Sequence, residues 1–260
     1  MHVYLELFGH KVASYGFFIA LGGIIVNLIA VYILSKRKMD INDFTIIESI
    51  GLLGAFIGAK LLYLVVSFKD IDWSRITNLS YLTQIMQGGF VFYGGFIGGI
   101  IAALIASKAN KIDFRSYADE VIFLIPLAHA FGRVGCFMAG CCFGKPYDGP
   151  FSVIFPDNSF AIHGVKLFPV QLFEACGLVI VSFALLFLKK LLSRQFQIEL
   201  YFILYGILRM ITETFRYDAA RGIFFDLSTS QWISILMITI GLASIWIQLK
   251  KSKGNECLAD

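Results

Sequence analysis

The chain has 260 residues, of which 58% are apolar and 15% are charged, and its mean hydropathy is +0.76. This composition is too apolar for an ordinary soluble domain and is typical of integral membrane proteins. The formal net charge is only +4, so composition provides no case for nucleic-acid binding.

Seven apolar runs lie along the chain, and each is long enough to cross ~30 Å of hydrocarbon. They cover about residues 14–34, 45–67, 89–107, 117–136, 170–188, 197–215 and 231–249. Helices are the default for such runs because lipid satisfies no backbone groups and the alternating pattern of a β-barrel is absent. The sequence predicts an all-α polytopic membrane protein of about seven transmembrane helices, with residues 1–260 forming a single domain.

Basic residues concentrate after the first, third, fifth and seventh runs. Each of these four segments holds three of them: Lys36, Arg37 and Lys38; Lys108, Lys111 and Arg115; Lys189, Lys190 and Arg194; and Lys250, Lys251 and Lys253. Since loops rich in Lys and Arg stay on the cytoplasmic side, we expect the N-terminus outside and the C-terminus in the cytoplasm.

Two segments on the predicted outer side are long, about residues 68–88 and 137–169. The second is rich in glycine, proline and aromatic residues. Long loops in compact proteins are usually functional or disordered, and the aromatic content favours order at the membrane interface. We therefore expect both segments to be ordered.

The stretch YGILRMITETFRYD, residues 205–218, places charge inside an apolar run. Arg209, Glu213 and Arg216 are spaced to share one helical face, and Tyr205 extends that row. Ionisable groups in a membrane span normally face the protein interior or a water-filled cavity. Two arginines and one glutamate leave a surplus of one positive charge, which suits a phosphate. A purely structural Arg–Glu–Arg ladder is the alternative.

A second candidate anchor is Arg133, in the stretch HAFGRVGCFMAGCCFGKP at residues 129–146. Glycines surround it, and irregular backbone at membrane depth is tolerated only when it is buried in protein or lines a cavity. An arginine reaching for the interface is the alternative. His129 lies four residues earlier and would share the face of Arg133, although a lone histidine on an apolar helix is more often structural.

Four further polar residues lie in or at the ends of apolar runs. Lys60 follows Gly54 and Gly58 in the second run, where it is either part of an anion site or reaches for the interface. Tyr93 lies among glycines in QGGFVFYGGFIGG, where tight helix packing is the main explanation for the glycines. Gln171 and Glu174 open the fifth run one turn apart, as helix caps or as the polar lining of a cavity.

The five cysteines form an odd set whose spacing matches no common zinc or disulfide framework. We expect no metal and no cofactor. A covalent lipid intermediate on Cys136, Cys141 or Cys142, and redox chemistry at these thiols, remain open as minor alternatives.

These motifs, in this order, resemble the prolipoprotein diacylglyceryl transferase family of bacterial inner-membrane enzymes. The matching stretches run from the second to the sixth apolar run: GAKLLY, QGGFVFYGGFIGG, PLAHAFGRVGCFMAGCCFGKP, FPVQLFEA and LYGILRMITETFRYD. The resemblance implies transfer of a diacylglyceryl group from phosphatidylglycerol to the lipobox cysteine thiol of prolipoproteins, the first step of lipoprotein maturation. It also implies a multi-pass protein of the bacterial plasma membrane whose partners are phosphatidylglycerol, prolipoprotein signal peptides and membrane lipids, without nucleic acid.

The resemblance also implies roles for individual residues. Arg133 is similar to the essential arginine of the family, and Gly140 and Gly144 to its conserved glycines. For catalysis we expect Arg133, Arg209, Glu213, His129 and Tyr93. For substrate binding we expect Arg133, Gly140, Gly144, Tyr205, Arg209, Arg216, Lys60 and Gln171. The two arginines would neutralise the leaving phosphate, Glu213 would orient them, and His129 is the candidate base because tyrosine titrates near pH 10.

The chain also departs from the family pattern. Cys136 and Ala139 replace two asparagines, Cys141 replaces a glutamate, and Tyr93 replaces a histidine. A related membrane transferase with a different acceptor is therefore the main alternative, followed by a membrane transporter or receptor. A transporter predicts polar residues along the whole path across the membrane, whereas the ionisable residues here lie mostly near the predicted outer half.

Overall fold

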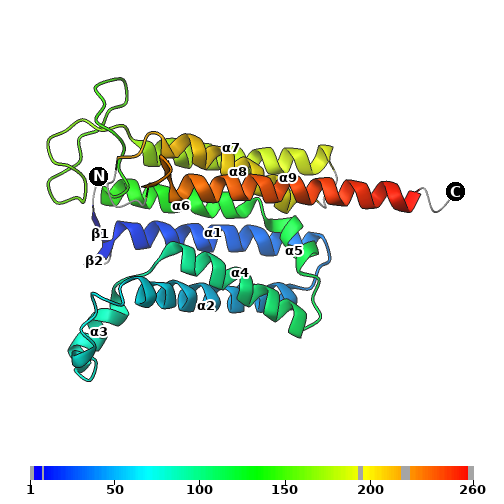
Figure 1. Cartoon of the computed structure of the whole chain (residues 1–260), viewed down its shortest axis with the longest axis horizontal. Coiled ribbons are helices and arrows are strands. Elements are labelled where there is room, and N and C mark those ends of the chain that lie inside the picture. Colours follow the sequence, from blue (N-terminus) through cyan, green and yellow to red (C-terminus); the bar gives the residue numbers. More distant parts are fainter. Residues whose placement is uncertain (1–2, 8, 193–195, 218–222, 257–260) are drawn as a thin grey trace. The chain divides into compact units, whose positions relative to one another are not determined.

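The computed structural model of the chain is mainly helical, and it describes residues 3–7, 9–192, 196–217 and 223–256 (Figure 1). The chain divides into two compact units. One consists of Met1–Ile33 with Ala118–Asp260, and the other is Leu34–Tyr117.

The first unit begins with a hairpin. Strands β1 (Tyr4–Leu7) and β2 (His10–Ala13) pair antiparallel and lead directly into helix α1 (Ser14–Lys36). A second short hairpin, β3 (Ile223–Phe224) and β4 (Leu227–Ser228), precedes the last helix α9 (Thr229–Glu256). Phe225 and Asp226 between these strands both have positive φ, as a two-residue type I′ turn requires.

Most of the first unit is a row of helices. After helix α5 (Phe114–Val121), whose residues are divided between the two units, come α6 (Leu124–Ala139), α7 (Val170–Leu191) and α8 (Gln197–Glu213). Helix α6 packs on α7, α7 on α8 and α8 on α9, as Figure 1 also shows. The core between them is Ala130, Ala175 and Leu178, with Tyr205 and Leu208 packed against it.

The fourth apolar run, predicted as one helix, is bent. Helices α5 and α6 meet at an angle of 54°. Pro126 lies in the first turn of α6, where it lacks an N–H and its ring crowds the carbonyl four residues earlier, so the helix cannot run straight through. The Phe123 carbonyl at the break accepts a 2.8 Å hydrogen bond from the Ser182 hydroxyl of α7. The bend is therefore compensated from the neighbouring helix.

The second unit is built on helices α2 (Ile41–Val66) and α4 (Phe92–Ala109), with a short 3-10 turn η1 (Trp73–Arg75) and helix α3 (Leu79–Gln87) between them. Asp40 caps α2 and Asn78 caps α3 through their side-chain oxygens. The glycines of α2 and α4 face each other, and a Cβ on Gly58 would come within 2.3 Å of the Gly94 carbonyl oxygen. Close packing therefore accounts for this glycine pattern.

The helices fit a membrane protein. Helices α1, α2, α7 and residues Thr229–Lys251 of α9 are long and apolar enough to cross a membrane, and the bent α5–α6 pair is a fifth candidate if it counts as one span. Every predicted apolar run coincides with a helix or with this bent pair. The all-helical, polytopic character is confirmed, while the count of seven crossings stays a prediction.

Candidate active site: a buried arginine–glutamate cluster

The carboxylate of Glu174 joins two helices. Its Oε1 lies 2.9 Å from Arg133 Nη2 on α6, and both of its oxygens lie 3.3 Å from Arg209 Nη1 on α8. The Glu174 side chain is only 1% exposed. Two guanidinium groups from separate helices therefore meet at one buried carboxylate contributed by α7, the helix between them.

Arg209 has two further partners. Its Nη2 lies 2.8 Å from Glu213 Oε2, one turn later on α8, and 3.1 Å from the Ser230 hydroxyl at the start of α9. The i,i+4 pairing expected from the sequence is thus present. We name Arg133, Glu174, Arg209 and Glu213 the arginine–glutamate cluster.

Arg216 lies elsewhere than predicted. Helix α8 ends at Glu213, so Arg216 does not continue its face. Instead Arg216 pairs as an isolated antiparallel bridge with Gly144 in the loop that follows α6. On either side of that pair, Lys145 N–H donates to the Phe215 carbonyl at 2.9 Å and Tyr217 N–H to the Phe143 carbonyl at 3.2 Å. The loop is thereby fastened to the end of α8.

The two glycines predicted for substrate binding have structural duties. Gly140 ends α6 in the left-handed conformation, with φ of 73°. A Cβ on Gly144 would lie 2.4 Å from the Phe168 carbonyl oxygen, so no larger residue fits the bridge to Arg216 without a shift. Both glycines shape the loop beside Arg133.

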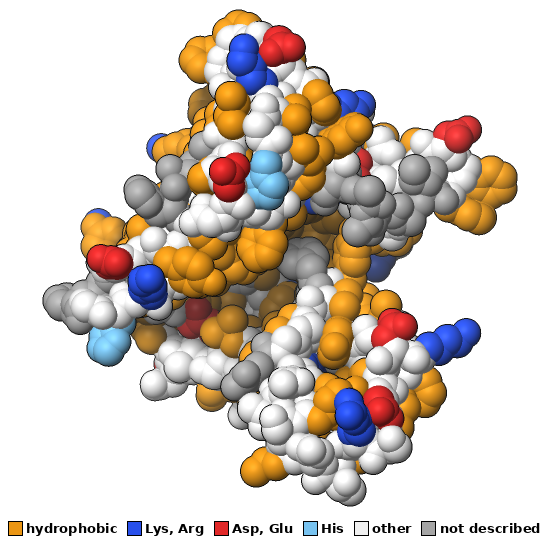
Figure 2. Space-filling view, turned by 90° about the vertical axis from the view of Figure 1, so that its left-hand side faces the viewer, with side chains coloured by type: hydrophobic (Ala, Val, Ile, Leu, Met, Phe, Trp, Pro, Cys, Tyr) orange, Lys and Arg blue, Asp and Glu red, His pale blue; other side chains and the backbone are white. Residues whose placement is uncertain are grey.

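The loop of residues 140–169 is packed on its own small core of Phe155, Ala161 and Leu167. Figure 2 faces the side on which this loop lies, and the charged side chains there are scattered among apolar ones, with acidic groups beside basic ones. In the loop, Lys166 lies 3.5 Å from Asp148 and His163 lies 3.8 Å from Asp157. The described surface of the loop therefore offers no basic patch to an anion, and the candidate anion ligands are the arginines of the buried cluster.

The charge balance of the cluster differs from the prediction. Arg133 and Arg209 face the carboxylates of Glu174 and Glu213, so these four side chains are neutral together. The positive surplus expected from the 205–218 stretch now depends on Arg216, because Glu174 supplies a second carboxylate from another helix. Arg216 is partly buried.

The cluster retains unused hydrogen-bonding capacity. Arg133 Nε and Gln171 Oε1 are among the buried side-chain atoms of the described residues that have no hydrogen-bond partner. A buried group left unsatisfied costs about 1–3 kcal/mol, more when charged. The Gln171 side-chain amide donates a hydrogen bond to the Cys141 carbonyl, at 2.8 Å. Glu174 is thus a member of the cluster and Gln171 contacts the loop beside it, while a role for Gln171 in lining a cavity stays a prediction.

His129 and Tyr205 lie one turn from the arginines of their helices. Their ring centroids are 5.8 Å apart, and Tyr205 also stacks on Tyr201 at 5.6 Å. The predicted base is thus in the first unit, on α6 with Arg133.

Two other predicted residues belong to the second unit. The Lys60 ammonium is buried and donates to the carbonyls of Ile85 and Gly88 at the end of α3. Tyr93 lies in the first turn of α4 and is half-buried. The roles of Lys60 in substrate binding and of Tyr93 in catalysis stay predictions.

Three cysteines stand beside Arg133. The Sγ atoms of Cys136, Cys141 and Cys142 lie within 4.8 Å of one another. Hydrogen bonds with the Cys136 and Cys141 thiols hold the pKa of Cys142 below its ordinary value, and the charges of Arg216 and Arg133 act in the same direction. Spacing in the sequence did not indicate this cluster, because Cys136 is on α6 and the others follow a left-handed turn.

Glu174 is the main residue of the site that the expected catalytic and binding sets omitted. The available signal was an acidic side chain in an otherwise apolar helix, which calls for a cationic partner. Its partners could not be identified by spacing, because they lie on two other helices.

The family model for prolipoprotein diacylglyceryl transferase matches residues 2–247 of the chain. The chain belongs to the prolipoprotein diacylglyceryl transferase family. The phosphatidylglycerol–prolipoprotein diacylglyceryl transferase of Clostridium tetani is 39% identical over 245 residues, covering 92% of this chain and 94% of that protein. Transferase 2 of Clostridium perfringens is 34% identical and covers 96% of each chain. The transferase of Clostridioides difficile is 32% identical and covers 97% of each. The resemblance found in the motifs is confirmed.

Proposed function

We propose that this chain transfers a diacylglyceryl group from phosphatidylglycerol to the lipobox cysteine thiol of prolipoproteins. Its family and the names of its relatives support the reaction. The observation that carries the site is the arginine–glutamate cluster, in which Arg133 keeps a buried donor without a described partner. A phosphate oxygen of the lipid headgroup would satisfy that donor.

The reaction makes specific demands on the site. The acceptor sulfur forms a bond to the glycerol carbon as the bond from that carbon to the phosphate oxygen breaks, so glycerol-1-phosphate leaves with the electron pair. Negative charge develops on the leaving oxygen, and a donor aimed at it can contribute about 2.7–4 kcal/mol in a site that excludes water. Arg133 is placed to do this, since its Nε has capacity to spare.

Arg209 has a different part in this proposal. Its contacts to Glu174, Glu213 and Ser230 occupy both terminal nitrogens. It therefore adds positive charge and holds Glu174 in place, and Glu174 orients Arg133. Arg216 supplies the net positive charge that captures an anionic headgroup.

The acceptor thiol must lose its proton, and we assign that step to His129. A thiol of pKa about 8.5 needs only modest help from a base or from nearby positive charge. The carboxylates of Glu174 and Glu213 are engaged in ion pairs, whereas His129 lies one turn from Arg133. The proton would pass from the acceptor sulfur to an imidazole nitrogen.

The membrane arrangement follows from the positions of charge. We propose seven crossings, the N-terminus outside, the cytoplasmic C-terminus and a plasma-membrane location, with residues 1–260 acting as one transferase domain. The cluster draws on the C-terminal parts of α6 and α8 and the N-terminal parts of α7 and α9, which form one end of the first unit. The positive-inside rule makes this the outer end.

The test uses the purified full-length protein in detergent–lipid micelles with phosphatidylglycerol and a lipobox peptide. We expect a thioether-linked diacylglyceryl peptide and an equal amount of glycerol-1-phosphate. Replacing the lipobox cysteine by serine should abolish the product. If neither product nor phosphatidylglycerol consumption occurs while a relative's enzyme works in the same assay, the proposed function is wrong.

A second candidate is transfer to a different acceptor, which the replacements at Cys136, Ala139, Cys141 and Tyr93 favour. Phosphatidylglycerol consumption without peptide modification would identify it. Failure to complement a cell depleted of its own transferase would agree.

A further inference from the structure

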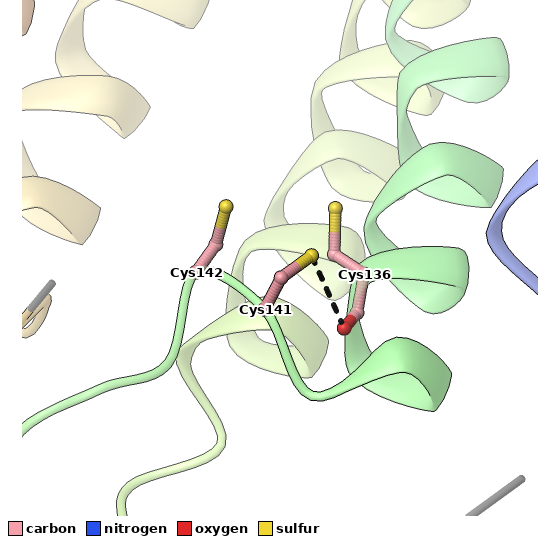
Figure 3. A group of neighbouring side chains, drawn as sticks. All are labelled: Cys136, Cys141 and Cys142. Carbon is pink, nitrogen blue, oxygen red and sulfur yellow. Dashed lines mark hydrogen bonds between the residues drawn. The ribbon is translucent and has the colours of Figure 1, made fainter. Parts of the chain in front are cut away.

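The three cysteines beside Arg133 form a compact sulfur cluster. Their Sγ atoms lie within 4.8 Å of one another, with Cys136 buried and Cys141 and Cys142 half-buried. Figure 3 shows that Cys136 comes from the last turns of α6 and the other two from the loop that follows. The cluster is therefore local in sequence but needs the chain to reverse direction.

The cysteines are held in place by a hydrogen bond between their own backbones and by a contact from α7. Gly140 turns left-handed, and the Cys141 N–H then donates to the Cys136 carbonyl at 3.1 Å. Cys142 itself has φ of 56°, a conformation that costs a non-glycine residue roughly 1–2 kcal/mol. The Gln171 side chain fixes the Cys141 carbonyl from α7. The thiols are thus brought together before any ligand arrives.

The distances between the three Sγ atoms are close to those expected around one metal ion. A metal–sulfur bond is about 2.3 Å, so three thiolates around one ion lie about 3.8–4.0 Å apart. The largest observed separation, at most 4.8 Å, needs to shrink by only about 1 Å. Small rotations of the side chains supply such a movement.

We propose that Cys136, Cys141 and Cys142 bind one soft metal ion, with copper(I) as the first choice and zinc(II) as the second. Thiolates select these ions over hard cations such as magnesium. No fourth cysteine, histidine or carboxylate joins the group in the described part of the chain. Three sulfurs alone complete a trigonal copper(I) site, whereas zinc needs a fourth ligand such as water.

Positive charge lies near such a site and offsets part of its negative charge. Three thiolates with copper(I) carry two negative charges, and with zinc(II) one. The positive charges of Arg133 and Arg216 both act on Cys142. Each thiol releases its proton when it binds the ion, so binding is a simple exchange of protons for metal.

The experiment measures metal retained by the full-length protein in detergent. The protein is reduced with a phosphine, and denaturing thiol titration first verifies that all five cysteines are free. Copper(I) is then offered in competition with a chromogenic chelator, and zinc(II) and magnesium(II) are offered separately. After desalting, we expect one equivalent of copper(I) per chain, weaker zinc retention and no magnesium.

Matched variants locate the ion. Even an outer partner of a metal ligand is worth about 10–100-fold in affinity, so Cys142→Ser or Cys141→Ser should weaken binding by at least about 100-fold. The double variant Cys176→Ala/Cys257→Ala keeps only the three clustered thiols and should bind normally. Thermal melting of each variant shows whether it is folded.

Two results would overturn the inference. One is no retained copper or zinc in the fully reduced wild-type protein. The other is retention that survives both serine variants or disappears in the double variant. Because binding is measured without lipid or peptide, its outcome is separate from that of the transferase assay.

Discussion

Lys60 is buried and Arg133 is mostly enclosed, both in apolar helices, yet these two cations differ in how their donors are used. The Lys60 ammonium, in a residue 6% exposed, donates to the carbonyls of Ile85 and Gly88 and lies 3.4 Å from those of Met86 and Gly89. Arg133 contacts Glu174, but its buried Nε has no described hydrogen-bond partner. The hydrogen-bond donors of Lys60 are all used within the protein, whereas one donor of Arg133 is not.

This difference in hydrogen bonding suggests a structural role for Lys60 and a ligand-binding role for Arg133. A buried charge is costly anywhere in a membrane span, so burial alone marks both residues equally. The unused donor is what distinguishes a group that fastens a loop from a group that can hold a ligand. On this basis Lys60 secures the end of α3, and Arg133 is the residue we expect to touch the substrate.

The largest effect should come from removing the shared carboxylate. Glu174→Leu leaves two buried guanidinium groups without their common partner, and breaking a buried pair costs about 3–5 kcal/mol. We expect that loss in the free energy of unfolding in mild detergent, with no residual transfer. Glu174→Gln is the milder control, since its amide oxygen still accepts a hydrogen bond. Wild-type stability in the leucine variant would mean that the cluster is not held by Glu174.

The next effect should be catalytic. Arg133→Lys keeps the positive charge but loses the planar fork and its Nε donor. Transfer should fall by about 10²–10³-fold while the melting temperature changes little. Lys166→Gln removes an exposed cation from the loop of residues 140–169 and should leave transfer unchanged. Equal rates for Arg133→Lys and wild type would contradict the contact with phosphate.

His129→Ala tests the proposed base, which lies one turn before Arg133 on α6. Loss of a general base lowers rates by about 10²–10⁴-fold, and the lower end applies because a thiol is easily deprotonated. Tyr93→Phe, in the other unit, should cost less. Single-turnover rates of peptide modification compare the two. If the tyrosine variant is the slower one, the proton goes elsewhere than His129.

Lys60→Met tests whether Lys60, whose donors are used by backbone carbonyls, has a purely structural role. The carbonyls of Ile85 and Gly88 lose their donor, so we expect a loss of about 1–3 kcal/mol in the free energy of unfolding. Transfer per folded molecule should stay near the wild-type value. If the variant folds well but transfers poorly, Lys60 takes part in substrate binding and does not differ from Arg133 in the way proposed here.

The last comparison concerns stability alone and separates two glycines of the first unit. A Cβ on Gly144 would lie 2.4 Å from the Phe168 carbonyl oxygen, whereas one on Gly132 would meet nothing within 4 Å. Gly144→Ala should therefore destabilise the protein by about 1–3 kcal/mol and Gly132→Ala should be neutral or slightly stabilising. Paired thermal melts decide the matter, and equal shifts would show that the loop adjusts freely.

What the sequence predicts well is whatever repeats along a single helix. The apolar runs, the facing glycines of α2 and α4, and the Arg209–Glu213 pair all follow from helical periodicity. The bend at Pro126 could have been anticipated, because proline disrupts the turn before it. These features need no knowledge of which helices are neighbours.

What the sequence predicts poorly is whatever depends on packing between segments. Glu174 meets arginines that are 41 residues before it and 35 residues after it. Arg216 was expected to continue the face of α8, but the helix ends three residues earlier. The cysteines converge only because Gly140 reverses the chain. Each of these three features depends on a turn or a neighbouring helix that the spacing of residues along the sequence does not reveal.

The spread of the arginine–glutamate cluster along the chain has a consequence for biosynthesis. Its contacts extend from Arg133 to Ser230, so it is complete only when nearly the whole polypeptide has left the ribosome. Inserting a single helix with an arginine at its centre into the bilayer costs about 2.5–3.5 kcal/mol of free energy. Helix α6 would therefore wait beside the translocation machinery until α7 delivers the carboxylate, and the pair would partition into lipid together.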